Sequence, residues 1–63
     1  MDKQEMETRI TSMLQAGGMK QTDIVDAFPM DQYIDVGHVL RDMEKRGLVQ
    51  REKMGSTKMV TLK

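Results

Sequence analysis

The sequence has no cysteine, a single histidine and no long apolar run. Without cysteine, neither a disulfide nor a thiolate metal site can stabilise the chain, and one histidine argues against zinc. No apolar run approaches the roughly 18 residues of a membrane span, and no signal-peptide pattern is present. We therefore expect a cytoplasmic protein with no metal, no cofactor and no membrane contact.

The chain also has no net charge, because ten acidic side chains balance ten basic ones. The charges are unevenly distributed, however. Residues 1–44 hold nine acids and four bases, a sum of −5, whereas residues 45–63 hold six bases and one acid, a sum of +5. A chain of 63 residues is expected to form one domain, residues 1–63, around a small core. That domain should be electrically polar, with its positive end near the C-terminus.

Residues 36–62 contain the clearest structural signal, a change from helical to strand periodicity. Apolar side chains recur at helical spacing at Val36, Val39, Leu40 and Met43. Gly47 suits the left-handed position that ends a helix, and alternation of polar and apolar residues follows it. Gly55-Ser56 suits a two-residue type II′ turn, which would pair Lys53 with Lys58. The pattern predicts a helix, a glycine cap and a β-hairpin.

The preceding residues predict two further helices. The first should cover about residues 2–16, capped by Asp2, with a stripe formed by Met6, Ile10, Met13 and Leu14. Met19 is either a very short third strand or a core plug. The second helix should cover residues 21–28 and turn three apolar residues inward, Ile24, Ala27 and Phe28. Pro29 ends it, because the residue before proline is disfavoured in helical geometry.

Three expectations concern the junctions with the third helix and the hairpin. Met30 should fill the turn after Pro29, and Asp31 should cap a third helix that runs to about Arg46. In the hairpin, one face should close over the helices through Val49, Val60 and Leu62.

The order helix, short strand, helix, turn, helix, hairpin resembles the winged helix-turn-helix family of bacterial and archaeal regulators. Residues 18–25 are similar to the entry of that family's second helix. The third helix and the start of the wing are matched by Val36, Leu40, Met43, Gly47, Leu48, Val49 and Arg51. The resemblance implies an α+β fold of three helices with a C-terminal β-hairpin wing. Residues 27–29 and 55–59 also resemble the small winged-helix D proteins that accompany dissimilatory sulfite reductase.

The resemblance implies that the outer face of the third helix enters the major groove of DNA. Opposite the apolar stripe lie Ile34, Gly37, His38, Arg41 and Lys45. Arg41 could pair with guanine, while His38 or Gln32 could donate to a base or a phosphate. Gly37 would permit close approach. The alternative is a solvated helix face, since this helix also carries acids that repel phosphate, at Asp31, Asp35, Asp42 and Glu44.

The predicted wing carries a basic strip, in which Lys53 and Lys58 face each other and Arg51 and Lys63 extend the strip. Directly opposed lysines destabilise a hairpin, and a phosphate between them would remove that repulsion. The alternative is that these lysines discourage edge-to-edge association of the hairpin. A catalytic role for His38 is disfavoured, because no cysteine and no second histidine accompany it.

Two functions follow from these patterns. The first is a small transcriptional regulator that binds double-stranded DNA, without enzymatic activity, as a monomer or weak homodimer. The second is an adaptor that docks another protein through exposed Ile34 and the acidic third helix.

Overall fold

Three helices and a small antiparallel sheet make up the computed structural model, which describes every residue from Met1 to Lys63. The helices are α1 (Lys3–Leu14), α2 (Gln21–Asp26) and α3 (Tyr33–Lys45), and a short 3₁₀ turn, η1 (Met30–Gln32), precedes α3. The strands are β1 (Met19–Lys20), β2 (Val49–Met54) and β3 (Thr57–Leu62). The predicted α+β fold is confirmed. None of the helices is long and apolar enough to cross a membrane.

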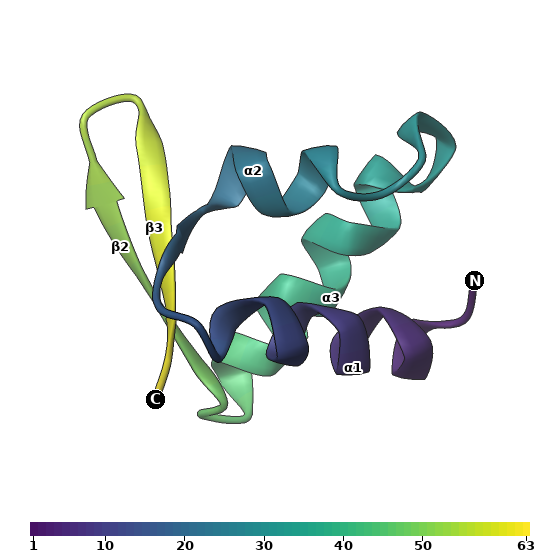
Figure 1. Cartoon of the computed structure of the whole chain (residues 1–63), viewed down its shortest axis with the longest axis horizontal. Coiled ribbons are helices and arrows are strands. Elements are labelled where there is room, and N and C mark those ends of the chain that lie inside the picture. Colours follow the sequence, from purple (N-terminus) through teal and green to yellow (C-terminus); the bar gives the residue numbers. More distant parts are fainter.

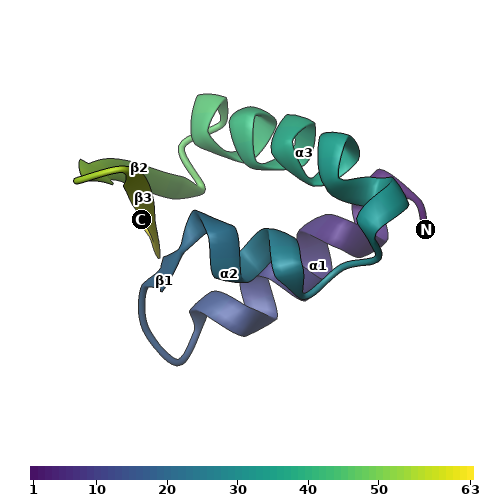
Figure 2. The ribbon, with the colours of Figure 1, turned by 90° about the horizontal axis from the view of Figure 1, so that it is seen from above.

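The helices form two layers beside the sheet. In Figure 1, α1 and α2 lie in front of α3, and the hairpin of β2 and β3 stands at one end. Figure 2 shows the same molecule from above, with α3 on one side and α1 and α2 on the other. The strand order is β1-β3-β2, so β3 is central. Met19 pairs with Val60, which confirms a short third strand in place of a simple plug.

The hairpin has the predicted register along its whole length, from Val49 opposite Leu62 to Met54 opposite Thr57. Gly55 adopts a φ of +64°, whereas Ser56 has no positive φ, and this sign pattern fits a type II′ turn. The turn residues therefore set the pairing by a local preference. As a result, Lys53 lies directly opposite Lys58.

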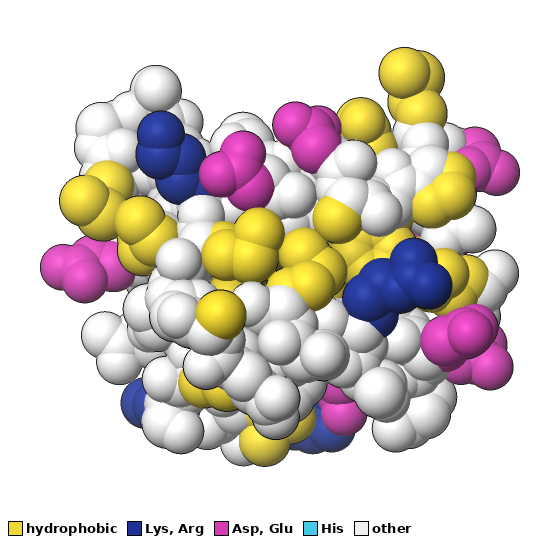
Figure 3. Space-filling model, viewed as in Figure 1, with side chains coloured by type: hydrophobic (Ala, Val, Ile, Leu, Met, Phe, Trp, Pro, Cys, Tyr) yellow, Lys and Arg dark blue, Asp and Glu magenta, His cyan; other side chains and the backbone are white.

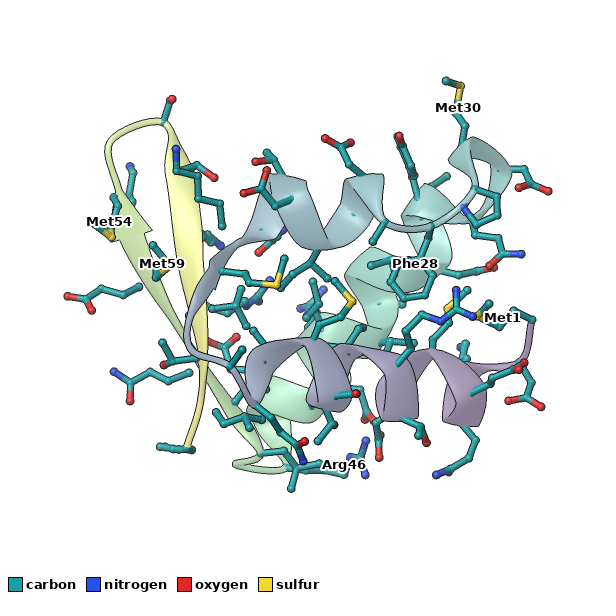
Figure 4. The ribbon with its side chains drawn as sticks, in the orientation of Figure 1. Met1, Phe28, Met30, Arg46, Met54 and Met59 are labelled. Carbon is teal, nitrogen blue, oxygen red and sulfur yellow. The ribbon has the colours of Figure 1, made fainter.

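The core contains eleven buried residues from all three helices, from the turn after α2 and from β2 and β3. They are Met6, Ile10, Leu14, Ile24, Phe28, Val36, Val39, Leu40, Met43, Val49 and Val60. All four residues of the predicted α3 stripe are among them. Figure 4 shows the Phe28 ring between α1 and α2. The N-terminus of α1 is also as predicted, because the backbone N–H of Glu5 donates to Asp2 Oδ1 at 2.7 Å.

Four predictions around α2 and the turn are wrong. The helix ends at Asp26, because Ala27 and Phe28 donate to carbonyls three residues back in tighter turns before Pro29. Ala27 is consequently exposed. Met30 is 79% exposed and points away from the molecule (Figure 4), since η1 starts there and turns its side chain outward. Asp31 lies inside η1, so it does not cap α3.

The hairpin contains one further error. Val49 and Val60 are buried as expected, but Leu62 is 37% exposed. Leu62 occupies the last rung of the ladder, opposite Val49, where the sheet reaches the edge of the core. Alternation assigned the correct face to Leu62, but on this last rung the core covers only the β2 side, so Val49 is buried and Leu62 is not.

Candidate nucleic-acid interface

The outer face of α3 presents the predicted side chains to solvent. Ile34 is 77% exposed, and His38, Arg41 and Lys45 are also exposed. Neither Arg41 nor Lys45 takes part in an ion pair. Gln32 differs, because it is half-buried just before α3 and its Oε1 is enclosed without a hydrogen-bond partner. The structure therefore places two free cations and one apolar side chain along this face, with Gln32 at its margin.

His38 lies at the border of α3 with α1. It lines a hollow of about 510 Å³ together with Glu7, Asp42 and Arg46. Arg46 forms ion pairs with Glu7 of α1 and, at 2.9 Å, with Asp42. The hydrogen bond to Glu7 is the main cause that raises the pKa of the Arg46 guanidinium. Figure 4 shows Arg46 at the end of α3 next to α1.

The two hairpin lysines flank a second, larger groove of about 650 Å³. This groove, called here the wing groove, lies between the hairpin tip, α2 and the start of α3, and its lining includes Gln21, Thr22, Asp26, Tyr33, Lys53 and Lys58. Both lysines are exposed and neither is in an ion pair. Asp26 is less free, because its Oδ1 accepts from the Tyr33 hydroxyl at 3.3 Å. The groove therefore brings two free ammonium groups near polar side chains and one carboxylate, that of Asp26.

Arg51 was predicted to be a free surface cation of the basic strip, but its guanidinium faces the helices and is hydrogen-bonded. Its Nε and Nη2 donate to Glu44 Oε1 at 3.1 and 2.8 Å, and its Nη1 donates to Gln21 Oε1 at 3.3 Å. The side chain is only 14% exposed. Arg51 alternates in phase with buried Val49, so it points toward the helices. That phase was the signal, visible in the sequence, that Arg51 faces inward.

These ion pairs change the electrostatics of α3. The hydrogen bond from Arg51 is the largest cause that lowers the pKa of the Glu44 carboxyl, and the nearby charge of Lys58 acts in the same direction. Glu44 and Asp42 thus each lie beside an arginine, whereas Asp31 and Asp35 have no ion-pair partner. The acidic character that opposes phosphate is therefore concentrated at the N-terminal end of α3. No three acidic, histidine or cysteine side chains gather closely enough to hold a metal ion.

The face formed by α1 and α2 is more apolar. In Figure 3 hydrophobic side chains form a band between these helices that continues toward the hairpin. At the hairpin end, Figure 4 shows Met54, which is exposed, and Met59, which is half-buried. This band lies on the side of α1 and α2, while the free cations described above lie on α3 and the hairpin.

Comparison with known proteins identifies the architecture. No protein-family model matches the chain, and no curated protein matches it in sequence. A crystal structure of a possible transcriptional regulator for arsenical resistance superposes on all of this chain and on 70% of its own, with a TM-score of 0.79 at 22% identity. The fold is a winged helix-turn-helix. The hairpin is its wing, and α2 and α3 are its helix-turn-helix.

A second winged-helix neighbour is the solution structure of apo-NmtR. It has a TM-score of 0.68 and 29% identity over 87% of this chain. That match spans only 45% of the NmtR chain, so this chain corresponds to less than half of that protein. The resemblance to the D proteins of dissimilatory sulfite reductase is not tested by these two structures and stays a prediction.

Proposed function

We propose that this chain binds double-stranded DNA as a transcriptional regulator, or as the DNA-binding part of one. The observation that carries the proposal is a set of four cations without ion pairs, on the outer face of α3 and on the wing of a winged helix. They are Arg41, Lys45, Lys53 and Lys58. Two winged-helix neighbours, one of them described as a possible transcriptional regulator, support it. In this arrangement α3 enters the major groove and the wing contacts the backbone.

The α3 contacts would provide sequence preference. Arg41, near the middle of the exposed face, can donate two hydrogen bonds to guanine. Ile34, two helical turns further toward the N-terminus, can contact the methyl group of thymine. His38 and Gln32 border this face and would donate to bases or phosphates at its edges. Lys45 lies in the last turn and suits a phosphate.

The wing contacts would provide affinity without sequence preference. Lys53 and Lys58 face each other across the ladder, and their like charges repel. A phosphate group above this pair would be attracted by both ammonium groups, so binding would relieve the repulsion. Arg51 is excluded from this set, because its guanidinium is engaged by Glu44 and Gln21.

A fluorescence-anisotropy titration of duplex DNA at several salt concentrations tests the proposal. If the three free lysines meet phosphates while Arg41 meets a base, log K should fall with log salt at a slope near −2.7, about 0.9 for each phosphate contact. Changing Lys53 and Lys58 together to alanine should reduce the slope by about two and weaken all sequences alike. Lys3→Ala on α1 serves as the control and should leave the slope unchanged. Absence of binding at low salt by the folded protein would exclude the DNA function.

The second candidate function is a protein-interaction module. The observation in its favour is the exposure of Met30 and Ile34, at 79% and 77%, near the start of α3. A pull-down from the native host with wild type and Ile34→Asp tests it, with thermal unfolding of both proteins as the control. A partner retained by wild type and lost by the variant would favour the adaptor. Identical partners in both lanes would exclude this apolar surface.

A further inference from the structure

We propose that Arg51 and Glu44 form a clamp that fixes the wing against α3, and that acidic Glu44 is therefore required for DNA binding. The clamp consists of Arg51 of β2, Glu44 of α3 and Gln21 of α2. The requirement for DNA binding rests on the proposed function, whereas the clamp itself can be tested without DNA. Arg51 and Glu44 are positioning residues here, since neither contacts DNA in the arrangement proposed above.

The geometry of Arg51 is that of a rigid connection. Two of its nitrogens converge on one carboxylate oxygen of Glu44, at 3.1 and 2.8 Å, while the third reaches Gln21. A guanidinium is planar, so three hydrogen bonds to two helices leave its strand little freedom to rotate. The Arg51 side chain is shielded from solvent, which strengthens its bonds, whereas the Glu44 side chain is 41% exposed and its charge is partly screened.

The position of Arg51 along β2 makes this connection important for the wing. Val49 and Val60 anchor the inner end of the hairpin in the core, but every residue of β2 beyond Arg51 is exposed. Lys53 lies two residues beyond Arg51, on the same face of β2 and nearer the tip. Lys58 lies opposite Lys53. The two lysines therefore lie beyond the last pairing of the hairpin with β1, Lys20 opposite Met59, and beyond Arg51, whose side chain makes the last hydrogen bonds from the hairpin to the helices. If that attachment is lost, their angle to α3 becomes variable.

Glu44 allows two opposed expectations for DNA binding. Electrostatics alone predicts that removal of an acid next to the basic wing strengthens binding, because one repulsive charge disappears. The clamp predicts that Glu44→Gln weakens binding, because Arg51 loses its charged partner and the wing loses its fixed angle. Loss of preorganisation leaves the number of phosphate contacts unchanged, so the salt slope should remain the same.

The test compares wild type, Glu44→Gln and Arg51→Met in the same anisotropy titration. We expect each variant to bind about tenfold more weakly at an unchanged slope, and the double variant to bind no more weakly than either single variant. Glu52→Gln is the matched control, since Glu52 is an exposed acid on the same strand without an ion pair. That control should bind as tightly as wild type or slightly tighter. Thermal unfolding establishes that every variant is folded.

Hydrogen exchange of the free protein tests the clamp independently of DNA. Amides of residues 52–59 should exchange faster in Glu44→Gln than in wild type, while those of α1 should be unchanged. Tighter DNA binding by Glu44→Gln, or a slope reduced by about one in Arg51→Met, would overturn the inference. Unchanged exchange in the wing would overturn the clamp, and the requirement for Glu44 with it, but not the proposed function. If the folded wild type binds no DNA, the requirement for Glu44 is overturned together with the proposed function.

Discussion

Replacement of glycine by alanine should change the stability of the protein in opposite directions at two positions, Gly18 and Gly37. A Cβ on Gly18 would lie 2.7 Å from Thr61 Cγ2 and 3.3 Å from the Val60 carbonyl oxygen, where the loop after α1 packs on β3. A Cβ on Gly37, in the middle of α3, would meet nothing within 4 Å. The first glycine is thus required by close packing, whereas the second lowers helix stability without any packing reason.

We expect Gly18→Ala to lower the free energy of unfolding by about 1–3 kcal/mol, the usual range for overpacking. Gly37→Ala should raise it by up to about 1 kcal/mol, because alanine favours the helix. Urea denaturation of the two variants and wild type measures both changes. Equal effects from the two substitutions would contradict the packing of the α1–β1 loop on β3.

At the scale of elements, two arginines join segments that are distant in sequence. Arg46 links the end of α3 to Glu7 of α1, and Arg51 links β2 to α3 and α2. In both cases the acid comes from residues 1–44 and the base from residues 45–63. The uneven charge distribution of the sequence is therefore partly used inside the fold. The remaining bases of the second segment are lysines without ion pairs: Lys45, Lys53, Lys58 and Lys63.

The Glu44–Arg51 pair predicts a pH dependence of stability. The folded protein lowers the pKa of Glu44 below its ordinary value of 4.5, so the folded state binds fewer protons there than the unfolded chain. The ion pair therefore stabilises the folded state fully above about pH 4.5, and this stabilisation is lost as the pH falls through the lowered pKa of Glu44. Near pH 7 the thermal midpoint of wild type should be higher than that of Glu44→Gln, and in acid the two midpoints should converge. A difference independent of pH would contradict the ion pair, and Glu52→Gln again serves as the control.

At the scale of the whole molecule, the fold depends on one core to which all the helices contribute. Leu40 is fully buried at its centre, so Leu40→Ala should cost about 2–5 kcal/mol, much of the stability of so small a domain. Leu48, which is exposed, offers the matched control, and Leu48→Ala should have little effect. Circular dichroism on heating measures both. An unchanged midpoint for Leu40→Ala would contradict the described core.

The features predicted from sequence are those set by local rules. Helical spacing identified the α3 stripe, and Gly55-Ser56 identified the turn and the full register of the hairpin. The errors arise where neighbouring elements decide burial. Met30 and Leu62 are apolar, but whether they are covered depends on the path of η1 and on the edge of the core. Arg51 was assigned to the surface by its charge, although its phase with Val49 pointed inward.

The separation of roles between arginine and lysine has a chemical consequence. In residues 45–63 both arginines hold the fold together, whereas all four lysines extend freely into solvent. Acylation of amines, whether by a reagent or by an acetyltransferase, would neutralise the lysines and leave both guanidinium groups intact. A fully acylated molecule should therefore keep its shape and its thermal midpoint but bind polyanions far more weakly, because Arg41 is then the only one of the four free cations that keeps its charge. Acylation would thus weaken recognition of DNA in this protein without unfolding it.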